Sequence, residues 1–199
     1  LSLRYNLYCL VLLMHNTQSS SVITKLISIL LLVGALTACG EEPQSESIIS
    51  DADVVGMTLE DVVTALETGA LSSAALVESY LARIESVDRR GPTLNAVIAI
   101  NPDAMARAAE SDARRAAGNA KSHLDGVPVL LKDNIESLDP MATTAGSTAL
   151  IDNVTGRDSP LVASLRSSGA IVLGKTNLSQ WANYRSTKSV SGWSSVGGL

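Results

Sequence analysis

A lysine that directly follows a short apolar run is the residue of this sequence best placed to carry out chemistry. The run covers residues 127–131 and leads into Lys132-Asp133-Asn134. A continuous run of this length predicts a strand buried on both faces, and ligand sites in open α/β sheets lie at the carboxyl ends of strands. Burial disfavours the charged ammonium and lowers its pKa, which makes a neutral amine available to accept a proton. Lys132 is therefore a candidate general base.

The same position also has two structural interpretations. A lysine at a strand end can lay its stem over apolar surface and keep its ammonium in water, or it can pair with the neighbouring Asp133. Among the other titratable groups, His123 has no Cys, Asp or Glu cluster at metal-ligand spacing, so we interpret it as a surface histidine. Glycine-rich phosphate loops are absent from the sequence.

The elements that must position Lys132 follow from apolar periodicity and from capping residues. Helices are predicted from Thr58 to Gly69, from Ser72 or Ser73 to Gly91-Pro92, from Pro102 to about Ala117, and over 158–168. Strands are predicted at 94–100, 127–131 and 170–173. The predicted inward residues are Leu76, Tyr80, Leu81 and Ile84 on the second helix, and Leu161, Val162 and Leu165 on the last. The strand–helix–strand order predicts a parallel unit, hence an α/β fold with an N-terminal helical cover.

Charge divides the chain at Cys39. Residues 1–38 contain two basic residues, Arg4 and Lys25, and no acidic one. From Cys39 onward, 13 basic residues stand against 20 acidic residues, a net formal charge of −7. A domain of this charge lacks the basic face that would neutralise phosphates, which argues against a nucleic-acid-binding protein.

The first 38 residues have the pattern of a secretory signal. We expect translation to begin at Met14. The eleven-residue, mainly apolar run from Leu26 to Leu36 forms a signal core that is short for a spanning helix, which needs about 20 apolar residues. Leu36-Thr37-Ala38-Cys39 resembles the bacterial lipobox, in which the cysteine thiol receives a diacylglycerol. By the same resemblance, Gly40 after the cysteine favours an outer-membrane lipoprotein facing the periplasm; otherwise the protein is periplasmic or secreted. An ordinary signal peptide or a buried cysteine remains the alternative for Cys39.

Three segments are therefore expected. Residues 1–38 comprise upstream residues and a signal peptide, residues 39–57 form a polar tether that carries the lipid, and residues 58–199 form the folded part. Cys9 lies in the first segment, so a single cysteine remains after processing and no disulfide framework is expected.

Five blocks of sequence occur in a specific order from residue 124 onward. They are 124–134 (around Lys132), 141–147 (MATTAGS), 158–162 (DSPLV), 169–183 (GAIVLGKTNLSQWAN) and 191–198 (SGWSSVGG). In this order and spacing they resemble the amidase signature family, and the resemblance runs from about Thr58 to Leu199. It implies the N-terminal part of an α/β fold with a mixed, largely parallel sheet flanked by helices.

The resemblance also implies a chemistry. Family members hydrolyse carboxylic amides with a Ser–cisSer–Lys triad, and Lys132 matches the lysine. No metal or cofactor is implied. The family assigns no proton-transfer role to the lysine at the Lys175 position, so Lys175 is expected to be structural. The patterns around Trp181 and Ser191 favour the peptide-amidase-like, secreted branch, which acts on a small amide or peptide amide.

The serines of the triad lie in a part of the family pattern that these residues do not match. Leu199 stands where glutamine is usual, and none of the serines Ser147, Ser167, Ser168, Ser194 and Ser195 occupies the matching motif. We therefore expect this chain to be an N-terminal piece of the amidase domain and to be inactive by itself. The residues predicted to contact substrate are Trp181, Ala182, Asn183, Ser191 and Gly192. Core packing for the first three and a structural turn for the last two remain alternatives.

Two other functions are compatible with these residues. One is that of the glutaminase component of the tRNA-dependent amidotransferase, although an export signal argues against an enzyme that works on charged glutamyl-tRNA in the cytoplasm. The other is a non-catalytic, truncated lipoprotein module.

Overall fold

The computed structural model describes residues 54–184, 187–188 and 190–198. The predicted signal peptide, Cys39 and most of the predicted tether lie outside these residues. The last four tether residues are described, and Val54 among them is buried in an apolar cluster with Val62 and Leu66. Among the described residues, packing therefore extends back to Val54, ahead of the predicted boundary at Thr58. None of the described helices is long and apolar enough to cross a membrane.

Helix α4 (Leu59–Thr68) begins and ends where the sequence predicts. The Thr58 side chain accepts from the Asp61 amide, and the Asp61 carboxylate accepts from the Thr58 amide, which completes a capping box. Gly69 ends the helix with φ of 73°, a left-handed conformation that glycine adopts without a Cβ penalty.

Helix α5 (Ser73–Arg83) follows after a short turn and is capped twice. The Ser72 hydroxyl accepts from the Ala75 amide. Asp112, on helix α6 (Ala104–Ala116), accepts from the amides of Ser73 at 2.7 Å and Ala74 at 3.0 Å. The carboxylate also complements the positive N-terminal end of the α5 dipole. One contact of α6 with α5 is thus made by the Asp112 carboxylate and the first two amides of α5, which have no partner within the helix. Beyond Arg83 the chain continues as a π-helical segment, η1 (Ile84–Arg89).

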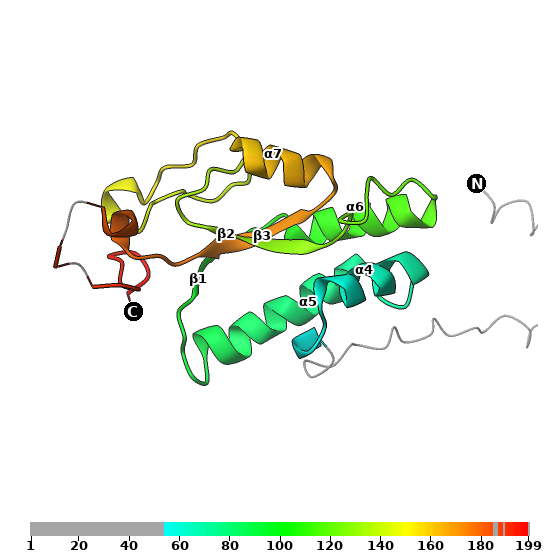
Figure 1. Cartoon of the computed structure of the whole chain (residues 1–199), viewed down its shortest axis with the longest axis horizontal. Coiled ribbons are helices and arrows are strands. Elements are labelled where there is room, and N and C mark those ends of the chain that lie inside the picture. The colour runs from blue at the N-terminus through cyan, green and yellow to red at the C-terminus, as the bar shows by residue number, and fades with distance from the viewer. Residues whose placement is uncertain (1–53, 185–186, 189, 199) are drawn as a thin grey trace, which may run out of the picture. The chain divides into compact units, whose positions relative to one another are not determined.

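The described sheet has three strands in the order β1-β3-β2 (Figure 1). Strands β2 (Pro128–Lys132) and β3 (Ile171–Thr176) run parallel, with helix α7 (Pro160–Ser167) between them in sequence, which confirms the predicted parallel unit. Strand β1 (Val97–Ile100) pairs antiparallel with the other edge of β3. The sheet is therefore mixed, and β3 is its central strand.

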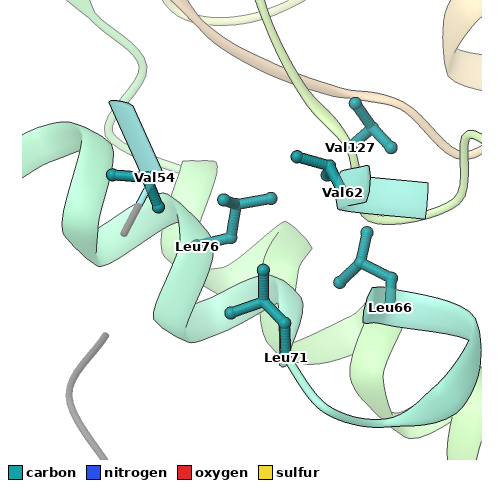
Figure 2. Close-up of a cluster of buried hydrophobic side chains, with 6 residues drawn as sticks. All are labelled: Val54, Val62, Leu66, Leu71, Leu76 and Val127. Atoms are coloured by element: carbon teal, nitrogen blue, oxygen red, sulfur yellow. The ribbon is translucent and has the colours of Figure 1, made fainter. Parts of the chain in front are cut away.

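Helices cover both faces of this sheet. On one face, α5 and α6 pack against β3 through a cluster that includes Val77, Ala108 and Leu173. On the other face, Val162 of α7 packs against Leu131 and Val172 of the two parallel strands. A third cluster joins α4 and α5 to the chain just before β2 through Val62, Leu66, Leu71, Leu76 and Val127, together with Val54 (Figure 2).

Two predictions about burial are wrong for particular residues. Strand β2 is not buried on both faces, because Leu130 is 42% exposed and Lys132 is exposed. The reason is its position, since among the described residues β2 pairs along one edge only, whereas β3 is paired on both edges and buried through Lys175. On α7, Leu161 is 57% exposed instead of inward, and Val162 alone is fully buried.

Helix α5 buries a wider stripe than the sequence predicts. Leu76 is buried as expected, but the adjacent Val77 is buried too, while Tyr80, Leu81 and Ile84 are only partly buried. Leu76 packs in the cluster with α4, and Val77 packs in the cluster with β3. A helix that contacts two partners at different angles buries neighbouring residues, which a single-stripe pattern does not capture.

Candidate functional site

Lys132 is the last residue of β2, at the carboxyl end of the strand as predicted, and pairs in register with Thr176 of β3. Its side chain is exposed, so the partial desolvation expected from a buried strand is not found in the described residues. The alternative pairing with Asp133 is not found either. The Asp133 side chain is buried and accepts instead from the amide of Thr144, at 3.2 Å, and from its hydroxyl.

A series of backbone hydrogen bonds runs from the residue after Lys132 to the predicted substrate-binding segment. The Asp133 amide donates to Thr176 at 3.0 Å, and the Asp133 carbonyl accepts from the Ala145 amide at 2.9 Å. The Ala145 carbonyl in turn accepts from the Trp181 amide at 2.9 Å. Trp181 is therefore held two hydrogen-bonded steps from the residue that follows the candidate base, although 48 positions separate Asp133 from Trp181 in the sequence.

Left-handed backbone conformations gather along this series. Ala145 has φ of 49°, and Trp181, Ala182 and Asn183 have φ of 54°, 53° and 61°. The last three belong to η3 (Gln180–Asn183). Each such residue with a Cβ costs about 1–2 kcal/mol, and conformations of this kind persist where surrounding contacts impose them, often at ligand-binding sites. Their clustering beside the end of β2 favours this region as the functional site.

Three of the sequence blocks meet at Gly146. Its φ is 76°, and a Cβ there would lie 2.7 Å from Ser194 Cβ and 3.2 Å from Gln180 Cα. The Ser195 hydroxyl donates to the Gly146 carbonyl at 3.0 Å. The turn at 144–147, the segment around Gln180 and the loop around Ser194 therefore pack so closely that only glycine fits between them.

The five residues predicted to contact substrate lie in two adjoining segments. Asn183 donates to the Ser191 hydroxyl at 3.2 Å, and the Gly192 amide donates to the Ser179 hydroxyl at 2.8 Å. Trp181 is 48% exposed and Ala182 is exposed, so core packing does not account for either residue. The structure brings these residues together, and their contact with substrate stays a prediction.

The serines near this region make structural hydrogen bonds. Ser194 is buried, donates to the Asn177 side chain at 2.7 Å and accepts from the Gly197 amide at 2.8 Å. Ser147 is also buried and precedes the short helix η2 (Thr148–Leu150). These contacts give Ser194 a structural role in the loop 191–198.

Lys175 lies deeper in the molecule than the sequence predicts, because its side chain is fully buried. Its ammonium donates to the Ile135 carbonyl at 2.5 Å and to the Thr143 hydroxyl at 2.8 Å. Burial lowers the pKa of Lys175, against the opposing influence of the carboxylates of Asp133, Asp139 and Glu136. The burial of Lys175 could have been predicted from a longer strand. The predicted strand ended at Leu173, whereas β3 continues to Thr176 and carries Lys175 inside the molecule.

An open hollow of about 500 Å³ is lined in part by the loop that follows Lys132. Its lining includes Asn134, Ile135, Thr143 and Ala145 from that loop, and Leu161 from α7. Two of these residues, Ile135 and Thr143, are the hydrogen-bond partners of Lys175. The buried ammonium is thus hydrogen bonded to two residues of the hollow's lining.

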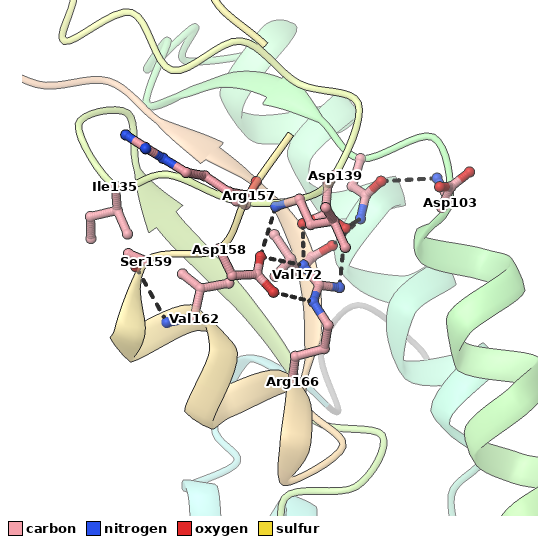
Figure 3. A network of polar contacts seen from close by, with 12 residues as sticks. Asp103, Ile135, Asp139, Arg157, Asp158, Ser159, Val162, Arg166 and Val172 are labelled. Atoms are coloured by element: carbon pink, nitrogen blue, oxygen red, sulfur yellow. Dashed lines mark hydrogen bonds and ion pairs between the residues drawn. The ribbon is translucent and has the colours of Figure 1, made fainter. Parts of the chain in front are cut away.

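An arginine fastens this loop to α7 (Figure 3). Arg166 donates to Asp158 at 2.8 and 3.0 Å and to Asp139 at 2.8 Å, and Asp139 also accepts from Asn101 at 3.0 Å. The hydrogen bonds from Arg166 hold the pKa of Asp158 below its usual value. Within the described part of the chain, no group of three or more His, Cys, Asp and Glu residues is placed to bind a metal ion.

Comparison with known proteins gives a consistent result. Residues 75–193 match the family model described as Amidase. A probable amidase of Arabidopsis thaliana is 46% identical over 142 residues, which cover 70% of this chain and 27% of that protein. A glutamyl-tRNA(Gln) amidotransferase chain of an Anaeromyxobacter strain is 42% identical over 114 residues, covering 57% of this chain and 22% of that protein.

Solved structures agree with these sequence matches. The native peptide amidase from Stenotrophomonas maltophilia superposes with a TM-score of 0.70 at 49% identity, covering 72% of this chain and 29% of that one. A peptide amidase in complex with the competitive inhibitor chymostatin gives the same values. The chain therefore spans between a fifth and a third of the length of these relatives.

Proposed function

Because this chain belongs to the amidase family, we propose that it supplies the lysine base of an enzyme that hydrolyses carboxylic amide C–N bonds. The observation that carries the proposal is the placement of Lys132. It ends a parallel strand, its side chain is exposed, and the backbone of the following residue is hydrogen bonded, through Ala145, to Trp181. A base at the end of a strand, beside a segment held in left-handed conformations, fits a site at the carboxyl edge of a sheet.

The proposed mechanism is that of the Ser–cisSer–Lys triad. The neutral amine of Lys132 takes a proton from a bridging serine, which deprotonates the nucleophilic serine as it attacks the amide carbon. The amine or ammonia leaves with a proton, and water then hydrolyses the acyl-enzyme. Both serines belong to the part of the family pattern that this chain does not match, so the proposal assigns them to a longer protein that contains this chain.

The exposure of Lys132 supports the proposal that this chain supplies the lysine and another part of the protein supplies the serines. A lysine is converted to an effective base by desolvation, and the described residues leave the Lys132 side chain exposed. In the proposed enzyme, the serine-bearing part covers the end of β2 and excludes water from the amine. The 199-residue chain by itself is then expected to be inactive.

The proposed substrate is a small amide or a peptide amide. The support is the similarity to peptide amidase, which extends over 72% of the chain at 49% identity. An amidotransferase-type glutaminase is the alternative within the same family, and the similarity to that relative is lower, at 42% identity over 57% of the chain. The alternative that is not an enzyme is a non-catalytic lipoprotein module.

The test compares two proteins on two substrates. We expect the purified 199-residue chain to hydrolyse neither a C-terminal peptide amide nor glutamine, and a full-length enzyme that carries these residues to release ammonia from the peptide amide. Turnover by the short chain that Lys132→Ala abolishes would contradict the expected inactivity. Glutamine hydrolysis without peptide amide hydrolysis would favour the amidotransferase-type glutaminase. No hydrolysis of either substrate by the full-length protein would favour the non-catalytic module.

We also propose that Cys39 anchors the protein to a membrane through a lipid, as its lipobox-like setting predicts. Cells that express the protein with labelled palmitate should incorporate the label, and Cys39→Ser should abolish incorporation, because the thiol is the site that receives the diacylglycerol. Ser45→Ala, in the same predicted tether, is the matched control and should leave labelling unchanged. Absence of label in the wild-type protein would refute the anchor and leave an ordinary exported protein.

A further inference from the structure

Lys175 connects two points of the loop that follows Lys132. Its ammonium donates to the carbonyl of Ile135 and to the side chain of Thr143, while the Ile135 amide donates to the Lys132 carbonyl at 2.9 Å. The first turn after the candidate base is therefore held at Lys132 on one side and at Lys175 on the other. Thr143, in turn, lies two residues before Ala145, which bonds to both Asp133 and Trp181.

Charge compensation of its neighbours does not explain why a lysine occupies this buried position. Each of the three carboxylates that favour its charged form has another partner. Asp133 accepts from Thr144, Glu136 accepts from Arg157 at 2.8 Å, and Asp139 accepts from Arg166 and Asn101. Removing Lys175 therefore leaves no carboxylate without a hydrogen-bond donor.

Packing does not explain the lysine either. A buried charge is costly, and filling this volume does not require one. Methionine has about the length of the lysine stem and carries no charge. The contribution that only Lys175 makes is the link between the Ile135 carbonyl and the Thr143 hydroxyl.

We propose that Lys175 is a positioning residue for the site: its buried ammonium holds the Lys132–Ile135 turn against Thr143. The proposal deepens the proposed function and rests on Lys132 being the base. The ammonium is hydrogen bonded to Ile135 and Thr143 and not to Lys132, so it acts through the backbone of the turn. By fixing the turn, it fixes the direction in which the Lys132 side chain leaves the sheet, and it shapes the wall of the adjoining hollow.

The first experiment measures local opening in the whole chain. Lys175→Met is compared with Lys121→Met, which makes the same substitution at an exposed lysine in the segment after α6. We expect amide hydrogen exchange of peptides covering 133–147 to rise at least about tenfold in Lys175→Met, because those amides are among the groups that the link orders. Exchange in α4 and α5 should match the Lys121→Met control.

Two results would overturn the proposal. Exchange in 133–147 equal to the control would mean that the loop holds its shape without the ammonium. Exchange raised uniformly over all elements, or loss of the whole fold, would mean that Lys175 supports global stability and has no specific role in the turn. Lys175→Arg keeps the charge but places its nitrogens differently, so it should open the loop to an intermediate degree.

The second experiment measures catalysis in a full-length enzyme that carries this chain. Lys175→Met should lower kcat for a peptide amide by about 10–100-fold, as expected for a misplaced catalytic group, with KM nearly unchanged. Lys175→Arg should recover part of kcat. Unchanged kcat with a loosened loop would reject the catalytic relevance of the turn. The exchange result does not depend on turnover, so a failure of Lys132 as the base and a failure of Lys175 as its positioning residue are told apart.

Discussion

Replacing Lys132 with alanine is expected to lower amide turnover of a full-length enzyme that carries this chain by at least about 10²–10⁴-fold, the usual contribution of a positioned proton-transfer group. The amine is the only group that the proposed mechanism offers for taking the proton of the bridging serine. Because the Lys132 side chain is exposed at the end of β2, its removal should leave the fold intact. Initial rates of ammonia release at saturating peptide amide, with far-ultraviolet circular dichroism as a folding check, measure the effect.

A second substitution separates loss of the base from loss of the charge. Lys132→Arg keeps a positive charge at the strand end, but a guanidinium does not deprotonate in proteins and cannot serve as a base. We expect it to be as inactive as Lys132→Ala. Lys121→Ala removes another exposed lysine and should retain wild-type turnover. Substantial activity in the arginine variant would show that Lys132 acts as a fixed charge, and full activity in the alanine variant would exclude it from the reaction.

Replacing Asp125 with alanine is expected to lower the free energy of unfolding by about 3–5 kcal/mol, the range for breaking a buried ion pair by removing one partner. Asp125 is fully buried and accepts from Ser111 at 2.9 Å, from Arg114 at 2.6 and 3.1 Å, and from the Lys121 amide at 2.8 Å. Without the carboxylate, the hydroxyl and the amide lose their acceptor, and Arg114 loses its counter-ion. Urea unfolding at neutral pH measures the change.

The pH dependence of stability gives an independent test of the same residue. Burial by itself would raise the pKa of Asp125, but hydrogen bonds from Arg114, the Lys121 amide and Ser111 outweigh it and hold the pKa below its usual value. A carboxyl with a lowered folded-state pKa contributes stability above its unfolded pKa of about 3.9. That contribution is lost as the pH falls through the folded-state pKa. The difference in stability between wild type and Asp125→Asn should therefore shrink as the pH is lowered from about 5 through about 4 and below.

The matched control is an ion pair of similar geometry at the surface. Glu136 accepts two hydrogen bonds from Arg157, both at 2.8 Å, but the arginine is largely exposed. Solvent screens such a pair and lets the partners rehydrate, so Glu136→Ala should change the urea midpoint little. Equal losses in Asp125→Ala and Glu136→Ala would contradict the assignment of Asp125 as a buried anchor of α6.

The candidate site shows where reasoning from the residues was sufficient and where it was not. The order of blocks along the chain identified the family and placed Lys132 at the end of a strand, and both follow from short stretches of sequence. The sequence was enough to select Ser191 and Gly192 as candidates. It did not predict that Ser191 would contact Asn183 and that Gly192 would contact Ser179. Gly146 was part of a recognised block, yet the need for glycine there arises from the approach of Ser194 and Gln180, which come from two other blocks.

The sequence by itself determined the features that depend on neighbouring residues. The capping box of Thr58 and Asp61 and the left-handed Gly69 involve atoms three residues apart or fewer, so local pattern predicts them. The parallel arrangement of β2 and β3 was predicted from the strand–helix–strand order.

Only the tertiary structure decided which lysine is buried. By sequence, Lys132 and Lys175 both follow apolar runs, and the first was expected to be desolvated and the second to be merely structural. In the structure, β3 is paired on both edges and carries Lys175 inside, whereas β2 pairs on one described edge and leaves Lys132 exposed. Burial depends on which strands and loops surround a side chain, and those neighbours come from distant parts of the chain. A local pattern predicts the strand. The order of strands in the sheet determines how exposed the side chains of that strand are to solvent.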